Sequence, residues 1–114
     1  MRIVIVEDSI PLEQVRDVAQ EYYTTMIKGV VDVERGVIAL GGEWHMDANN
    51  RLIEHGSMQD HVWGFNYVLD GPKAGSIEYH SLINIRPAQG NHSMEVLDES
   101  LREQMSKIIL KRIQ

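Results

Sequence analysis

The sequence predicts an α+β fold: a single domain with a mainly antiparallel sheet of about five strands, built from hairpins, and two long helices packed on one face. Three observations support this prediction. The chain has 114 residues, enough for one hydrophobic core and too few for two. Short β-branched segments alternate with turn residues, as in hairpins. Two longer segments place apolar residues at helical spacing.

The first predicted elements are a strand at Ile3–Val6 and a long helix over residues 11–28. Four successive β-branched residues favour a strand that is covered on both faces. Pro11 suits the first turn of a helix, and Lys28 with Gly29 provides a C-terminal stop. Between these signals, apolar residues recur at intervals of three and four: Leu12, Val15, Ala19, Tyr22 and Met26.

A hairpin is predicted next, around the turn Glu34-Arg35-Gly36. β-branched runs flank this turn, and Gly36 can adopt the left-handed conformation that a short loop requires. The pair Gly41-Gly42 at the far end of the hairpin indicates a bulge or a close backbone approach.

The second half of the chain is predicted to hold a short helix, two more strands and a final helix. The polar stretch 47–55 is expected to form a short surface helix. The strands are expected at Val62–Leu69 and Ser76–Arg86, and the second of these alternates apolar and polar residues. The final helix should span residues 98–113, with Asp98 as its N-cap.

Composition excludes several classes of protein. The chain has no cysteine, which rules out disulfides and thiolate chemistry and favours a reducing, cytoplasmic location. Its net charge is −6 and its 11 Lys and Arg residues are scattered, so we expect no nucleic-acid surface. No apolar run is long enough for a signal peptide or a membrane span, so we expect no membrane association. We also expect no cofactor.

The first candidate segment for chemistry is Gly41–Asp47, in which Glu43, His45 and Asp47 are spaced two apart. In an extended chain all three side chains would point the same way, and a carboxylate beside an imidazole can build a general base. The trio is therefore the candidate catalytic group. Two alternatives stay open: a metal site, although structural zinc sites normally use four ligands, and a solvated strand end with no chemical role.

The second candidate segment is the strand end and loop Ile83–Ser93. Arg86 offers a planar fork of donors for a carboxylate or phosphate, and a glycine in the loop allows close backbone approach. Alternatively, Arg86 pairs internally and the amides tie down the loop. The candidate ligand-binding residues here are Asn84, Arg86, Gln89, Gly90 and Asn91.

The third candidate segment is Gly56–Asn66. Trp63, Phe65 and Tyr67 are spaced two apart, so they line one face of the predicted strand. Such a face is more often core than a platform for a ligand. Gln59 and Asn66 are the polar residues of this segment that could reach a pocket, so both join the candidate binding residues together with Trp63.

These three segments resemble a family of small prokaryotic proteins of unknown function. The resemblance rests on the motifs GGE-x-H-x-D, GS-x-Q…WG-x-N and INIRP-x-x-GN-x-S, and it extends over nearly the whole chain. It implies no activity. The positions that match the motifs are Glu43, His45, Asp47, Gln59, Trp63, Asn66, Asn84, Arg86, Gly90 and Asn91.

The leading functional hypothesis from the sequence is a small polar pocket where the three segments converge. Arg86 would hold an anionic or polar ligand, and His45 would be the titrating group of a site that could be hydrolytic. The rival hypothesis is a structural or interaction module, forming a homodimer, in which the polar residues lock loops and sheet edges. The sequence does not decide between an enzyme and a non-enzymatic module.

Overall fold

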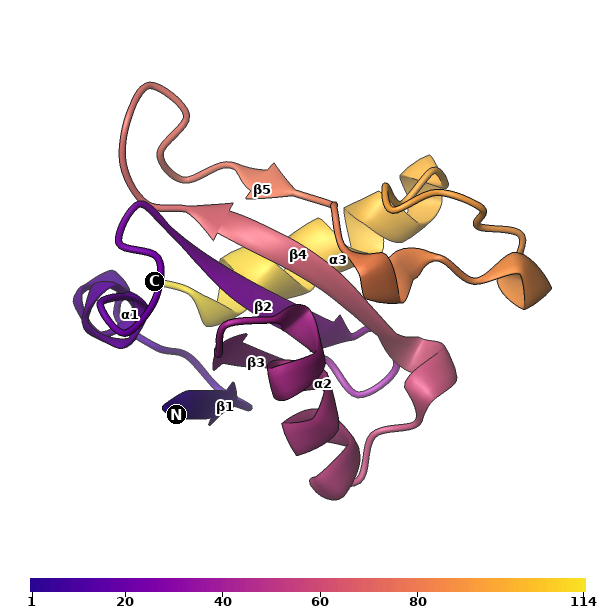
Figure 1. Cartoon of the computed structure of the whole chain (residues 1–114), viewed down its shortest axis with the longest axis horizontal. Coiled ribbons are helices and arrows are strands. Elements are labelled where there is room, and N and C mark those ends of the chain that lie inside the picture. The colour runs from indigo at the N-terminus through magenta and orange to yellow at the C-terminus, as the bar shows by residue number, and fades with distance from the viewer.

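The computed structural model describes all 114 residues and contains one five-stranded antiparallel sheet with helices on both faces (Figure 1). The order across the sheet is β1-β3-β2-β4-β5. The strands are β1 (Ile3–Val6), β2 (Met26–Asp32), β3 (Val37–Gly41), β4 (Val62–Val68) and β5 (Ile77–Glu78). The predicted α+β class and mainly antiparallel sheet are confirmed.

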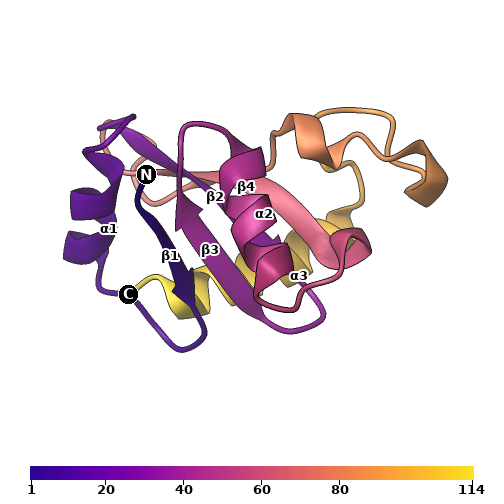
Figure 2. The same ribbon diagram turned by 60° about the horizontal axis from the view of Figure 1, so that its bottom comes forward.

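Three helices pack on the sheet rather than the two long helices of the prediction. They are α1 (Leu12–Ala19), α2 (His45–Glu54) and α3 (Glu99–Arg112). The predicted short helix is α2, which covers one face of the sheet, whereas α1 and α3 pack on the other (Figure 2). Asp98 caps α3 as predicted, because its Oδ1 accepts hydrogen bonds from two N–H groups of the first turn. None of the three helices has the length and apolar character to cross a bilayer.

The prediction that the first helix continues to residue 28 is wrong. α1 ends at Ala19, and β2 begins at Met26. Tyr22 and Met26 continue the helical spacing only by coincidence, since Tyr22 follows the end of α1 and Met26 is the first residue of β2. β2 forms backbone ladders with both β3 and β4, and this pairing outweighs a local apolar pattern.

Side chains alternate between two cores along the strands. Towards α1 and α3, Val31, Ile38 and Phe65 join a large cluster with helix residues such as Ile109. Towards α2, a smaller cluster holds Val30, Val37, Ala39, Ala48, Leu52 and Val62. The smaller core ends where β4 reaches Asn66, so polar side chains follow apolar ones on the α2 face.

The predicted strand over residues 76–86 is mostly absent. Only Ile77–Glu78 pairs with β4, and the chain then forms two 3₁₀ turns, Leu82–Asn84 and Pro87–Gln89. The side chain of Ser81 accepts a hydrogen bond from the N–H of Ile83 and so begins the first turn. A local hydrogen bond of this kind competes with strand pairing, which is why alternation misled the prediction.

The two glycine predictions agree with the structure. Gly36 has φ +69° in the hairpin loop. Gly41 has φ +113°, and a Cβ atom there would lie 2.3 Å from the carbonyl oxygen of Arg2. At Gly42 a Cβ atom would lie 2.7 Å from Cβ of Asp47, so the absence of side chains lets the first turn of α2 approach β3 closely.

Candidate functional site

A cavity of about 460 Å³ lies on the α2 face of the sheet, beside the smaller core. Its walls come from β2, β4, the start of α2 and the chain that follows β5. We call it the His45 cavity. It is lined by Lys28, Trp44, His45, Met46, Asn66, His80, Ser81, Leu82, Ile83 and Met94.

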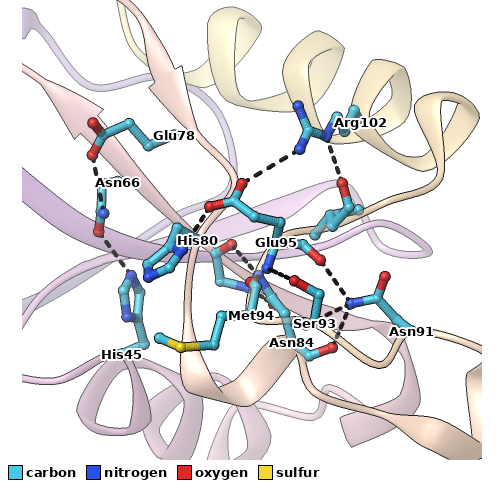
Figure 3. Close-up of polar contacts among 12 residues, drawn as sticks. His45, Asn66, Glu78, His80, Asn84, Asn91, Ser93, Met94, Glu95 and Arg102 are labelled. Atoms are coloured by element: carbon cyan, nitrogen blue, oxygen red, sulfur yellow. Dashed lines mark hydrogen bonds and ion pairs between the residues drawn. The ribbon is translucent and has the colours of Figure 1, made fainter.

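The imidazole of His45 is held in one tautomer by its neighbours, and Figure 3 shows two residues of this arrangement, Asn66 and Glu78. Nε2 lies 2.9 Å from the carbonyl oxygen of Phe65 and 2.9 Å from Oδ1 of Asn66. The Nδ2 group of Asn66 donates to Oε1 of Glu78 at 3.2 Å, which orients the amide so that its oxygen faces His45. Both neighbours of Nε2 are therefore acceptors, so Nε2 carries the proton and Nδ1 keeps a lone pair.

The lone pair of His45 is open to a ligand. The residue is only 8% exposed, and its Nδ1 has no hydrogen-bond partner. Nδ1 is nevertheless accessible to solvent, because Oδ2 of Asp32 is the one side-chain polar atom of the chain that is fully buried without a partner. Burial lowers the pKa of His45 to about 4, with a smaller contribution from the charge of Lys28, against the opposing effect of its two hydrogen bonds. The imidazole is consequently a neutral acceptor near pH 7.

Lys28 supplies a cation at the same cavity. It lies on β2 directly opposite Asn66, and its Nζ is 5.2 Å from the centroid of the Tyr23 ring. No carboxylate lies within 4 Å of the amine. Partial burial lowers the pKa of Lys28, and the negative charge of Glu78 opposes that effect. The protein thus leaves this ammonium group without an ion pair.

The mouth of the cavity is apolar. Trp44 is 61% exposed, Met46 47% and Leu82 68%. A group of large exposed apolar side chains around one hollow is typical of a binding surface. The cavity therefore combines a polar inner wall with an apolar rim.

A second hollow of about 360 Å³ shares Asn66 and His80 with the His45 cavity. On that side, Nδ1 of His80 lies 2.6 Å from a carboxylate oxygen of Glu95. Glu95 also contacts Arg102 at 3.4 Å, and the Arg102 guanidinium stacks over the ring of Tyr79. Figure 3 shows this chain of side chains beside Asn66.

The predicted trio Glu43, His45 and Asp47 does not share one face, because α2 begins at His45. Oδ2 of Asp47 accepts hydrogen bonds from the N–H groups of Glu43 and Trp44, at 3.1 and 2.9 Å, so this carboxylate caps the helix. The side chain of Glu43 is exposed and makes no hydrogen bond, while its carbonyl oxygen accepts one from the hydroxyl of Tyr23. Of the trio, His45 alone lines the cavity.

Arg86 lies away from the His45 cavity and is engaged by the protein itself. Its guanidinium stacks over the ring of Trp63, 4.3 Å from the centroid. Its N–H groups donate to the carbonyl oxygens of Ile83 (3.1 Å), Gln59 (2.9 Å) and Val62, and to the side chain of Gln89 (3.3 Å). Burial lowers the pKa of Arg86, against the charge of Asp60.

The buried amides also bind backbone. Asn84 pairs with both backbone groups of Gly64, and Nδ2 of Asn91 donates to three carbonyl oxygens, those of residues 84, 93 and 95. Gln59 differs from these two, because it is exposed and exchanges two side-chain hydrogen bonds with Asn49.

Gln89 donates to the carbonyl oxygen of Asp60. Gly90 has φ +77° and ends a 3₁₀ turn. Of the candidate binding residues, Asn66 is the one that lines the cavity together with His45.

Sequence reasoning missed Lys28, His80 and the apolar rim. A strand at residues 26–32 would have revealed Lys28, because alternation places it on the same face as Val30 and thus under α2. The long predicted helix hid this signal. No local pattern marks His80 as a neighbour of His45, because their proximity depends on how β5 pairs with β4.

No group of three or more His, Cys, Asp and Glu side chains is placed to hold a metal ion. In comparisons with known proteins, a family model described as "Protein of unknown function (DUF5674)" matches residues 4–112. No curated protein and no solved structure matches the chain.

Proposed function

We propose that this chain, which belongs to the DUF5674 family of proteins of unknown function, binds a small ligand with an apolar body and an anionic head group in the His45 cavity. The observation that carries the proposal is the placement of an unpaired ammonium, Lys28, beside an open imidazole acceptor and an apolar rim. A carboxylate or similar anion would pair with Lys28, while the apolar body would rest against Trp44 and Leu82.

Binding is better supported than hydrolysis. A general base works best when its pKa lies near the working pH, and the low pKa of His45, about 4, makes it a poor proton acceptor near pH 7. The carboxylate of Asp47 is used as a helix cap, so it does not orient the imidazole. His45 instead supplies a fixed hydrogen-bond acceptor for a donor group of the ligand other than its anionic head, which pairs with Lys28.

In this proposal the ligand is bound by His45, Asn66 and Lys28, and not by Arg86. Arg86 already donates to four protein oxygens, and a guanidinium so engaged has little capacity left for an anion. We also propose a cytoplasmic location, supported by the absence of cysteine.

The test is an NMR titration of the ¹⁵N-labelled chain with benzoate, compared with uncharged benzamide and with inorganic phosphate. We expect saturable shifts at Lys28, residues 44–46 and residues 80–83 with benzoate, and weaker binding of the other two probes. Lys28→Met should abolish the preference for benzoate over benzamide, whereas the exposed control Lys73→Met should keep it. Absence of saturable shifts at these residues, or an unchanged preference in Lys28→Met, would refute the proposal.

A second candidate function is assembly into a homodimer through β1, which forms one edge of the sheet (Figure 1). No hydrogen bond joins the outer backbone groups of Ile3–Val6 to another segment. Arg2 precedes this strand, and Glu7 and Asp8 follow it. An antiparallel pair of β1 strands would place Arg2 of each copy near the two acids of the other, which makes the edge self-complementary.

Light scattering over a range of concentrations tests the homodimer. Arg2→Glu should shift the wild-type dimer to monomer, and adding Glu7→Lys and Asp8→Lys to that variant should restore the dimer. A wild-type chain that is monomeric at every concentration, or a charge reversal without effect, contradicts this candidate.

A further inference from the structure

Lys28 differs from the other lysines of the chain in its surroundings. The chain has three more, Lys73, Lys107 and Lys111, and all three are exposed. Lys28 is half-buried on the cavity wall, with no carboxylate within 4 Å and no hydrogen bond from its amine to the protein. It is therefore a primary amine without an ion pair, on a side chain that lines a space large enough for a small molecule.

Several elements contribute titratable or aromatic side chains to the surroundings of Lys28. β5 contributes Glu78, α2 contributes the neutral imidazole of His45, and the chain after β5 contributes His80. Tyr23 places its ring 5.2 Å from Nζ. Glu43 lies in the turn before α2, and Asp47 lies in the first turn of α2, where its carboxylate is committed to the helix cap.

The surroundings of Lys28 favour the neutral form of its amine more than full exposure to water would. Burial disfavours the charged form, and the pKa of Lys28 is lowered although Glu78 opposes the effect. A lower pKa means that a larger fraction of the amine is neutral at any pH below it. Only the neutral amine is a nucleophile, and desolvation is a known route to reactive lysines.

We propose that Lys28 forms an imine with the carbonyl group of a small aldehyde or ketone held in the His45 cavity. The inference rests on the proposed function, because it needs the cavity to accept a small molecule. It extends that function from reversible binding of an anion to covalent capture of a carbonyl compound.

The step balances without an added reductant or oxidant. The lone pair of Nζ forms a bond to the carbonyl carbon, and the π electrons of the C=O bond move to its oxygen. The two hydrogens of the amine are transferred to this oxygen, which leaves as water when the C=N bond forms. Water carries the proton from Nζ to the oxygen, because His45, with a pKa of about 4, is a poor proton acceptor near pH 7.

The experiment is reductive trapping of the intact chain with benzaldehyde and cyanoborohydride, followed by peptide mass spectrometry. The other three lysines serve as internal controls. We expect Lys28 to be modified several-fold faster than each control, with a rate that rises with pH at a lower midpoint than theirs. Equal or slower modification of Lys28 over the whole pH range would overturn the inference.

Two further measurements separate the inference from the proposed function. Added benzoate should slow the modification of Lys28 and leave that of Lys73 unchanged, because benzoate would occupy the cavity. If benzoate binds but Lys28 shows no preference, the imine is refuted and the binding proposal stands. If Lys28 is trapped preferentially but benzoate neither binds nor protects, the anion site is refuted and the imine stands.

Discussion

Asn84 pairs with Gly64 as a neighbouring strand would. Its Oδ1 accepts a hydrogen bond from the N–H of Gly64 at 2.8 Å, and its Nδ2 donates to the carbonyl oxygen of Gly64 at 3.0 Å. β5 pairs only with Asn66 and Tyr67 of β4, so the amide of Asn84 satisfies the edge of β4 beyond the end of β5. One side chain thus continues the sheet where the backbone leaves it.

Asn84→Ala should therefore be strongly destabilising. The substitution leaves two buried backbone groups of Gly64 without partners, and each such group costs about 1–3 kcal/mol. We expect a loss of about 3 kcal/mol in the free energy of unfolding, measured by urea denaturation. Asn50→Ala, at an exposed position of α2, is the matched control and should change stability little. A loss for Asn84→Ala no larger than for Asn50→Ala would contradict the pairing.

Gly64→Ala should destabilise the chain through steric contacts, of which those with Ser81 are the closest. A Cβ atom at Gly64 would lie 2.6 Å from Cβ of Ser81 and 3.1 Å from the side chain of Ile83. Overpacking of this kind costs about 1–3 kcal/mol. Adding Ser81→Gly removes the nearest atom, so the double variant should lose less than the sum of the single variants. Strictly additive losses in a double-mutant cycle would show that Ser81 is not the obstacle.

Arg86→Ala and Arg86→Lys should both lower stability by about 1–3 kcal/mol, because the partly buried hydrogen bonds to the carbonyl oxygens of Ile83 and Val62 lose their charged donor. Lysine cannot reproduce the planar stack over Trp63 or reach several carbonyl groups at once. Thermal melts should show the losses, with Arg51→Ala at an exposed helix position as the neutral control. Full stability of Arg86→Lys would mean that charge alone suffices there.

His45 should make the protein sensitive to acid. Its pKa is about 4 in the folded chain and near 6.5 in an unfolded one, so between these values the unfolded state binds more protons. Stability attributable to His45 is complete above pH 6.5 and falls as the pH drops towards 4. The full change is at most roughly 3 kcal/mol.

Denaturation curves at pH 7 and pH 4 measure this effect as the difference between wild type and His45→Gln. The wild type should lose more stability on acidification than His45→Gln, whereas the exposed control His92→Gln should follow the wild type. Identical pH dependence in wild type and His45→Gln would exclude a depressed pKa for His45.

Much of the fold follows from local signals. The N-cap at Asp98 and the Gly36 turn are determined by neighbouring residues, and both were predictable. The end of α1 was not, because residues 22–28 fit a helical stripe as well as a strand. What decides between them is the pairing of β2 with β3 and β4, which is a tertiary effect.

The candidate site was less accessible to sequence reasoning than the fold. His45 and Asn66 could be named because each residue type suits a polar site, but their contact depends on how α2 crosses β4. Arg86 looked like an anion site by residue type alone. Its stack on Trp63 and its bonds to backbone oxygens come from distant segments that no local pattern brings together.

The side chains of Asn66 and His80 line both the His45 cavity and the second hollow. Asn66 is held at both ends, by His45 and Glu78, whereas His80 is held by a single contact with Glu95. A molecule that filled both hollows would therefore contact one side chain that is fixed at two points and one that is fixed at a single point.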